Sequence, residues 1–314
     1  MNRETNSVSV LISTYNGEDY IIEQLESLLN QTRSIDEVVI VDDCSTDRTV
    51  EVVRSFIDKN QLTDQWKVFE NEVNKGWRRN FMDGVLMTSG NIVLFSDQDD
   101  YWFKHKVERH MNIFDEHPEI NVTGSPLIFW DGKNREEKLI SDEYDVICLA
   151  DNPDKYLIQA LGCTMGFRKE YFMSHLKYHF ENWAHDDFLW KLSIADGSCA
   201  YLKEPCIYHR VHGNNASLKR RNLKERQEAC IRAISTAEQL EKCVIDEKNK
   251  NYEKNMNIIS HKKNGEQTRL AFLKTGNPFQ LMKLVFKYSD VYARRRQIIM
   301  DMIFTYKLDM FIKR

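Results

Sequence analysis

The chain has 314 residues, of which 42% are hydrophobic and 11% aromatic, so a sizeable core can form and global disorder is excluded. Its seven cysteines are odd in number and form no CxxC pair, which excludes a disulfide framework and a zinc knuckle. Residues 1–7 lack the apolar stretch of a signal peptide, and no segment approaches the ~18 uninterrupted apolar residues of a membrane span. We therefore expect a cytoplasmic protein.

The net charge of −4 hides an asymmetry along the chain. Residues 262–314 hold 12 lysines and arginines against 4 acidic residues, whereas the rest of the chain holds 32 against 44. An acidic body is thus followed by a basic tail. This pattern is typical of a tail that meets an anionic partner.

The first part of the chain alternates between strand and helix patterns. Strands are predicted at 8–13, 37–41, 66–70 and 91–95, and helices at 17–30, 47–59 and 78–88. Such alternation predicts βαβ units and therefore an α/β fold with a mainly parallel, Rossmann-like sheet. Helices on both faces of the sheet would explain why the strands are almost continuously apolar.

The later part of the chain is less regular. Residues 122–130 are predicted as one strand, and residues 133–160 as irregular chain. Shorter strands are expected at 162–167, 200–202 and 207–209, with helices up to 176 and over 187–195. From residue 218 the composition favours helix. We predict an α/β domain over 1–217 and a helical, basic C-terminal extension over 218–314.

Polar residues gather where the first four predicted strands end, in the segments 13–17, 42–47, 74–79 and 97–100. In an open α/β sheet, ligands bind outside the carboxyl ends of the strands, so four such ends would line one crevice. Taken singly, each segment is equally well explained as a helix N-cap or a turn. The chain has neither a GxGxxG nor a GxxxxGK[ST] loop, so a diphosphate would have to be held by the acidic segment 97–100 with a bound ion, helped by Arg78 or Arg79.

The run Phe95-Ser96-Asp97-Gln98-Asp99-Asp100-Tyr101-Trp102 places three carboxylates within four residues, directly after a predicted buried strand. Crowded carboxylates repel one another unless a positive charge joins them. Mg²⁺ and Mn²⁺ prefer carboxylate oxygens and often take their remaining ligands from water and substrate phosphates. The run predicts a metal-assisted diphosphate site, with a solvated acidic turn as the alternative.

Three segments, Val8 to Gly17, Val41 to Asp47 and Asp97 to Asp100, together resemble the family 2 inverting glycosyltransferases with the GT-A fold. The resemblance covers the chain from Val8 to about Ser217. The amino-acid sequence of residues 95–102, together with residues 74–76 and 80–81, is similar to the bacterial rhamnosyltransferase-like branch of this family. That branch builds capsule, O-antigen and cell-wall polysaccharides. The later segments that resemble this branch are 162–165, 185–186, 189–190 and 210–215.

The resemblance implies roles at the matching positions. Asp43 would accept hydrogen bonds from the base of a nucleotide, with Ser13 beside it. Asp97 and Asp99 would form the DxD pair, with Asp99 the more direct metal ligand, and Asp186 would be the general base. The full expected donor site is Ser13, Thr14, Tyr15, Asp43, Asn74, Arg78 and Asp97, and the expected metal site is Asp97, Asp99 and His212.

Several roles stay open when the residues are considered alone. Asp186 can be a helix N-cap, and Asp187 can be the base instead. His212 can ligate the ion, bind the diphosphate or be a hydrogen-bonded loop histidine. The tryptophans Trp102, Trp183 and Trp190 can face an acceptor sugar or fill the core, and for Trp190 the core is favoured.

The chain departs from the family pattern at two positions. Cys44 replaces the glycine or asparagine that is common after the paired aspartates, and His209 stands where a tyrosine often precedes the arginine. We expect neither residue to touch a catalytic group.

The sequence thus predicts a metal-dependent inverting glycosyltransferase that uses Mn²⁺ or Mg²⁺. It would move a sugar from a nucleotide-diphosphate donor, dTDP-rhamnose or a UDP-sugar, to a hydroxyl of a glycan or lipid-linked acceptor. A non-catalytic nucleotide-sugar-binding scaffold is the alternative. A nucleotidyltransferase would need a glycine- and arginine-rich loop with a lysine, which residues 13–17 do not provide.

The C-terminal extension mixes apolar and basic residues over 279–304. Basic amphipathic helices can lie in an anionic membrane interface, here the inner face of the cell membrane. A homodimer interface or a cap on the first domain explains the composition equally well. No nucleic-acid partner is expected.

Overall fold

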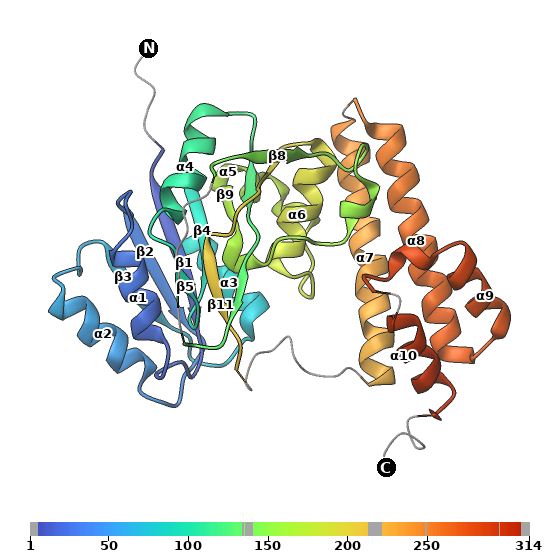
Figure 1. The fold of residues 1–314 in the computed structure, drawn as a ribbon, viewed down its shortest axis with the longest axis horizontal. Helices are drawn as coiled ribbons and strands as arrows, with labels where there is room; N and C mark the ends of the chain where they lie inside the picture. Colours follow the sequence, from blue (N-terminus) through green and yellow to red (C-terminus); the bar gives the residue numbers. More distant parts are fainter. Residues whose placement is uncertain are drawn as a thin grey trace. The chain divides into compact units, whose positions relative to one another are not determined.

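The computed structural model describes residues 6–133, 135, 141–212, 222–248, 250–294 and 296–308. The chain divides into two compact units, each described by itself below and drawn in Figure 1. The first unit comprises Met1–Cys148, Ile158–Lys177 and Ala184–His212, and the second comprises Leu149–Leu157, Tyr178–Trp183 and Gly213–Arg314. The division at residue 217 that the sequence suggests stays a prediction.

The first unit begins with the expected alternation of strands and helices. Its elements are β1 (Val8–Thr14), α1 (Ile21–Leu29), β2 (Glu37–Asp42), α2 (Thr49–Lys59), β3 (Trp66–Glu70), α3 (Trp77–Met87) and β4 (Ile92–Asp97). Strands β3, β2, β1 and β4 are parallel neighbours in that order. β1, β2 and β4 are almost entirely buried, as their continuous apolar runs predict. β4 continues to Asp97, so the first carboxylate of the acidic run is a strand residue.

Four further strands extend this sheet beyond β4: β9 (Gly166–Arg168), β6 (Val122–Gly124), β10 (Cys199–Leu202) and β8 (Tyr144–Ile147). Among the described residues the sheet has eight strands in the order β3-β2-β1-β4-β9-β6-β10-β8. β9 is antiparallel to both of its neighbours, β6 and β10 are parallel, and β8 is an antiparallel edge. The predicted α/β fold with a mainly parallel sheet is confirmed.

The prediction of a single strand over residues 122–130 is wrong, because this segment contributes strands to two sheets. β6 joins the large sheet, whereas β7 (Ile128–Trp130) pairs with β11 (Ile207–Arg210) in a small sheet that β5 (Tyr101–Trp102) completes. Pro126 lies between β6 and β7, and a proline cannot donate the hydrogen bond that a continuous strand needs. The small sheet brings residues 207–212 to the acidic run.

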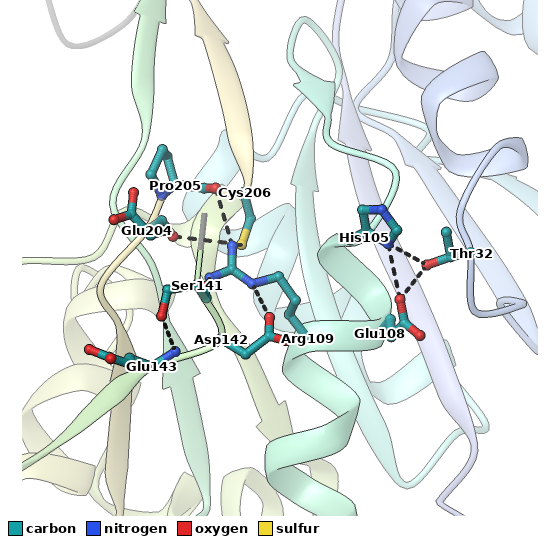
Figure 2. A network of polar contacts seen from close by, with 10 residues as sticks. All are labelled: Thr32, His105, Glu108, Arg109, Ser141, Asp142, Glu143, Glu204, Pro205 and Cys206. Atoms are coloured by element: carbon teal, nitrogen blue, oxygen red, sulfur yellow. Dashed lines mark hydrogen bonds and ion pairs between the residues drawn. The ribbon is translucent and has the colours of Figure 1, made fainter. Parts of the chain in front are cut away.

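The first unit also contains α4 (Lys106–Glu116), α5 (Lys169–His175) and α6 (His185–Asp196). Figure 2 shows how α4 is fixed to its surroundings. The buried Arg109 guanidinium donates to Asp142 Oδ1 at 3.0 Å and to the carbonyl oxygen of Pro205 at 3.4 Å. At the start of the helix, Thr32 Oγ1 donates to Glu108 Oε2 at 2.8 Å. α4 therefore ties the loops before β8 and β11 to the body of the unit.

The second unit is built from α7 (Leu223–Glu247), α8 (Tyr252–Thr275), α9 (Pro278–Phe286) and α10 (Arg296–Thr305). α7 begins with a capping box between Asn222 and Glu225. A buried carboxylate, Asp301, binds Arg226, Arg269 and Tyr292. The expected helical C-terminal region is confirmed. None of the described helices combines the length and apolar composition needed to cross a bilayer.

Candidate active site

A line of buried polar side chains joins the carboxyl ends of β1 and β2 to α3. Asn80 donates to Ser13 Oγ at 2.7 Å and to the carbonyl oxygen of Val41 at 2.8 Å. Its own side-chain oxygen accepts from Asn71, which also donates to Asp43 Oδ1 at 3.0 Å. Ser13 and Asp43 are therefore fixed in one network. Asn80 belongs to a segment that carries the family resemblance, but its contacts with Ser13 and Val41 are long-range and could not be predicted from local sequence.

Asp43 holds the loop between β3 and α3. Its carboxylate accepts the backbone N–H groups of Lys75 and Gly76, each at 2.8 Å. Gly76 has φ of +80°, a conformation that favours glycine, and its N–H also lies 3.0 Å from Asn74 Oδ1. Asp43 is almost completely buried, but its Oδ2 accepts a single bond from the described residues and can accept another. Next to it, Thr14 donates to Asp42 Oδ1 at 2.8 Å.

The end of β1 is paired directly with the acidic run. The Tyr15 N–H donates to Gln98 Oε1 at 2.8 Å, and Gln98 Nε2 donates to the Tyr15 carbonyl oxygen at 3.0 Å. A Cβ atom at Gly17 would lie 2.3 Å from the same Gln98 oxygen, so a side chain there would displace Gln98 from this pairing. The Tyr15 side chain stays 46% exposed.

The two arginines at the start of α3 differ in their partners. Arg79 forms an ion pair with Asp83 at 2.8 Å. The Arg78 guanidinium lies 4.3 Å from the ring centroid of Trp77, in a cation–π contact.

The three tryptophans of uncertain role are core residues. Trp102 and Trp190 are fully buried in the first unit. Trp183 belongs to the second unit, where its ring stacks on His179. The acceptor-facing alternative is therefore wrong for these tryptophans, and core packing is confirmed for Trp190.

Asp99 and Asp100 bind two different histidines near the end of the first unit. Asp99 Oδ2 lies 2.7 Å from His212 Nε2. Asp100 is fully buried, and its Oδ1 lies 2.8 Å from His209 Nδ1 and 3.3 Å from the backbone nitrogen of Arg210. His209, which we expected to touch no catalytic group, thus contacts Asp100, a carboxylate of the acidic run to which the sequence assigned no role. Residues 213–215 of the last family segment lie outside the described residues.

Arg210 also holds the acidic run, by a contact that the sequence did not reveal. Its Nε donates to the carbonyl oxygen of Asp99 at 2.9 Å, and its guanidinium forms an ion pair with Glu23. The guanidinium lies 4.3 Å from the ring centroid of Trp130. Arg210 thereby connects β11, α1 and the loop that carries Asp99.

Burial and mutual repulsion dominate the electrostatics of the acidic run. Burial, followed by the charges of Asp100 and Asp99, raises the pKa of Asp97 to about 8. The pKa of Asp99 is raised as well, by burial and the charge of Asp100. Burial opposes the charged form of His209, yet the hydrogen bond to Asp100 and the surrounding carboxylates raise its pKa to about 9. In the absence of a bound cation, the carboxylates thus favour the charged form of His209.

The residues present fit a divalent cation. Asp97, Asp100, Cys163 and His209 each offer one donor atom within 4.8 Å of the others, while Asp99 and His212 form a second pair beside them. Asp100 Oδ2 is buried and has no hydrogen-bond partner among the described residues. Burial raises the pKa of the Cys163 thiol far above its usual value, which leaves oxygen and imidazole as donors. Such donors suit Mn²⁺ and Mg²⁺.

A lysine lies buried behind the acidic run. Lys106 is fully buried, its Nζ donates to the carbonyl oxygen of Cys163, and it lies 3.4 Å from the ring centroid of Trp102. Burial lowers its pKa to about 8, although the charges of Cys163, Cys206 and the acidic run work in the opposite direction. The sequence did not mark Lys106, since a lysine at the start of a helix is ordinarily solvated.

Asp186 lies in the first turn of α6, whose N-cap is Ala184, so the N-cap interpretation of Asp186 is wrong. Burial, followed by the charge of Asp187, raises the pKa of Asp186 to about 6. The charge of Asp186 in turn contributes to the raised pKa of Asp97, which places the two carboxylates in one electrostatic neighbourhood. Asp187 is neutralised by an ion pair with Lys191. Of the two, Asp186 is the carboxylate available to accept a proton.

The sheet, its polar strand ends and the adjoining acidic run have the GT-A architecture of nucleotide-sugar-dependent glycosyltransferases. Residues 9–176 match the family model described as Glycosyl transferase family 2. The chain belongs to the family 2 glycosyltransferases.

Two curated relatives illustrate the range of similarity. An uncharacterized glycosyltransferase of Haemophilus influenzae is 34% identical over 222 residues, which span 67% of this chain and 70% of that protein. The poly(ribitol-phosphate) beta-N-acetylglucosaminyltransferase TarS of Staphylococcus aureus is 40% identical over 112 residues. That match spans 35% of this chain but 19% of TarS.

Two solved structures share the fold. TarS 1–349 in complex with UDP-GlcNAc has a TM-score of 0.61 and 19% identity, covering 92% of this chain and 93% of that one. The mannosyltransferase PcManGT of Pyrobaculum calidifontis, in complex with GDP-Man and Mn²⁺, has a TM-score of 0.54 and 16% identity. It covers 99% of this chain and 89% of its own. At these identities the likeness concerns the fold.

Proposed function

We propose that this protein is a metal-dependent, inverting glycosyltransferase that transfers a sugar from a nucleotide-diphosphate donor to a hydroxyl group. The observation that carries the proposal is the combination of a crowded acidic run with Asp186, a partly exposed carboxylate of raised pKa in the same neighbourhood. The first can hold the cation and the diphosphate, and the second can accept a proton.

The donor binds along the carboxyl ends of β1, β2 and β4. Asp43 Oδ2 receives an N–H of the base, and Ser13, Thr14, Tyr15 and Asn74 line the nucleoside. Arg78 meets the diphosphate from α3. UDP-sugars are the first donors to test, since TarS was solved with UDP-GlcNAc, and GDP-mannose and dTDP-rhamnose follow. The acceptor is a glycan or a lipid-linked glycan of a bacterial surface polysaccharide.

Asp97, Asp99 and His212 would hold Mn²⁺ or Mg²⁺. The bound cation supplies a Lewis acid that neutralises the diphosphate as it leaves. Asp99 is the direct ligand, with His212 already 2.7 Å from its carboxylate, and Asp97 supports the donor. Asp100 is committed to His209 and Arg210, so it positions the loop without being a ligand of first choice.

Asp186 takes the proton of the attacking hydroxyl. As that oxygen forms its bond to the anomeric carbon, the carbon–oxygen bond to the diphosphate breaks and the electron pair leaves with the phosphate. Attack from the face opposite the leaving group inverts the anomeric centre. No covalent enzyme intermediate is required, and a well-placed general base contributes about 10²- to 10⁴-fold to the rate.

The test is a panel of nucleotide sugars, measured by titration calorimetry with and without Mn²⁺ and by slow hydrolysis of the donor. We expect cation-dependent binding of one donor. Asp99→Ala should lose this binding, whereas Asp186→Asn should keep it and lose transfer by about 10²-fold or more. The matched control Asp187→Asn should retain transfer, because Asp187 is paired with Lys191.

The outcomes separate the parts of the proposal. Equal donor affinity for wild type and Asp99→Ala would remove the metal assignment, and normal turnover by Asp186→Asn would move the base elsewhere. If donor binds but neither wild type nor any variant hydrolyses or transfers it, the alternative of a non-catalytic nucleotide-sugar-binding scaffold is supported.

A further inference from the structure

Helix α9 of the second unit turns large apolar side chains toward solvent. Phe279, Met282 and Phe286 follow the i, i+3, i+7 spacing of a single helix face, and their side chains are 72%, 55% and 82% exposed. A lone exposed apolar residue is ordinary, but a row of this kind marks an interaction site.

The outward direction of this row is fixed by the packing of α9. Leu284 is fully buried and Leu281 partly buried against a cluster that includes Phe272 and Tyr288. Asn277 caps the helix by accepting the N–H of Phe279 at 2.9 Å. Since leucines already fill the inward side, turning the helix to bury the phenylalanines would expose the leucines.

The same face is positively charged. Lys283 and Lys287 are exposed on α9 and just after it, and residues 270–289 contain no aspartate or glutamate. The next acidic residue, Asp290, is already bound to Lys262 and His261. In the part of the chain that the structure describes, neither lysine forms an ion pair with a carboxylate.

We propose that this face of α9, made of Phe279, Met282, Lys283, Phe286 and Lys287, docks the protein on an anionic lipid surface. The phenylalanine rings enter the boundary between headgroups and acyl chains, and the lysines stay at the level of the lipid phosphates. A second copy is a poorer partner, because a two-fold contact would bring the lysines of both copies together. The proposal does not depend on the transfer reaction.

The experiment is co-sedimentation of the full chain with vesicles of phosphatidylcholine alone or with about one third phosphatidylglycerol. We expect binding to the anionic vesicles that weakens as salt screens the lysines. The pair Phe279→Ser and Phe286→Ser should lower the partition coefficient roughly tenfold or more. The pair Lys283→Glu and Lys287→Glu should lower it by a similar factor, roughly tenfold.

Matched controls come from α7 of the same unit. Ile231→Ser with Ile245→Ser removes two side chains that are 49% and 42% exposed, and Lys224→Glu with Lys242→Glu makes the same charge change. These variants should bind like wild type, and circular dichroism should show all variants folded.

Three outcomes would overturn the proposal. The first is that the wild type does not bind anionic vesicles. The second is that the α7 variants lose as much binding as the α9 variants. The third is a dimer in light scattering that the α9 phenylalanine variant dissociates while no form of the protein binds vesicles.

Discussion

Cys44 adopts a backbone conformation that few side chains accept. Its φ is +65°, in the left-handed region where glycine and asparagine are favoured. This explains physically why the family prefers those residues at the position. The thiol makes one weak contact, 3.7 Å from the carbonyl oxygen of Glu72. The strain at Cys44 is therefore scarcely offset by its side chain.

Replacing Cys44 should stabilise the protein. We expect Cys44→Gly to raise the free energy of unfolding by about 1 kcal/mol, because the left-handed penalty disappears while glycine adds some entropy to the unfolded chain. Denaturant unfolding measures this difference. Cys44→Ala is the matched control, since it removes the thiol but keeps a Cβ atom. An equal gain from both variants would mean that strain is not the cause.

At the scale of elements, the approach of α3 to the sheet depends on Gly84. A Cβ atom there would lie 2.7 Å from Leu11 Cδ1 and 3.3 Å from Val41 Cγ2, and Leu11 is fully buried in β1. α3 carries Asn80, which fixes Ser13 and supports Asp43 through Asn71. The distance between helix and sheet thus sets the positions of Ser13 and Asp43, the residues proposed to meet the nucleotide.

Gly84→Ala should destabilise the protein by about 1–2 kcal/mol, although alanine is the better helix former, because overpacking a rigid core outweighs helix propensity. Thermal or denaturant unfolding measures the loss. Adding Leu11→Val should recover part of it by making room. If Gly84→Ala were more stable than the wild type, the core would have rearranged to accommodate the added methyl group.

Some of these elements could be predicted from the sequence, and others could not. Strands β1, β2 and β4 carry strong apolar runs, and the polar segments after them indicate the candidate site. The split of residues 122–130 was missed because the apolar pattern does not reveal that two sheets share one segment. The contacts of Asp100 with His209 and of Lys106 with Cys163 join residues far apart in the chain, so no local pattern encodes them.

For the whole molecule, the raised pKa of Asp97 should make both the folding stability and the proposed cation binding depend on pH. Its pKa is about 8 in the folded protein and about 4 in an unfolded chain. The raised pKa favours the folded state at low pH, and this contribution is lost as pH rises from about 4 through 8. The ion-free protein should therefore lose stability toward pH 8.

A bound cation must displace the proton on Asp97, so we expect Mn²⁺ or Mg²⁺ to bind roughly tenfold or more tightly at pH 8 than at pH 6. Thermal unfolding with and without the cation should show a larger rise in Tm at pH 8. Asp97→Asn should flatten this dependence. The same rise at both pH values would show that Asp97 keeps no proton for the cation to displace.

The histidine partners of the acidic run lie far from it in the sequence. His209 binds Asp100 across 109 residues, and His212 binds Asp99 across 113. During synthesis, β1 to β4 leave the ribosome and can pair long before β11 appears. Until then the carboxylates of Asp99 and Asp100 lack their histidine partners, and the Asp99 carbonyl oxygen lacks the Arg210 guanidinium. Closing so long a loop is slow. The proposed cation site is therefore completed last, so a nascent chain that ends before residue 207 has the strands of the large sheet but lacks His209 and His212.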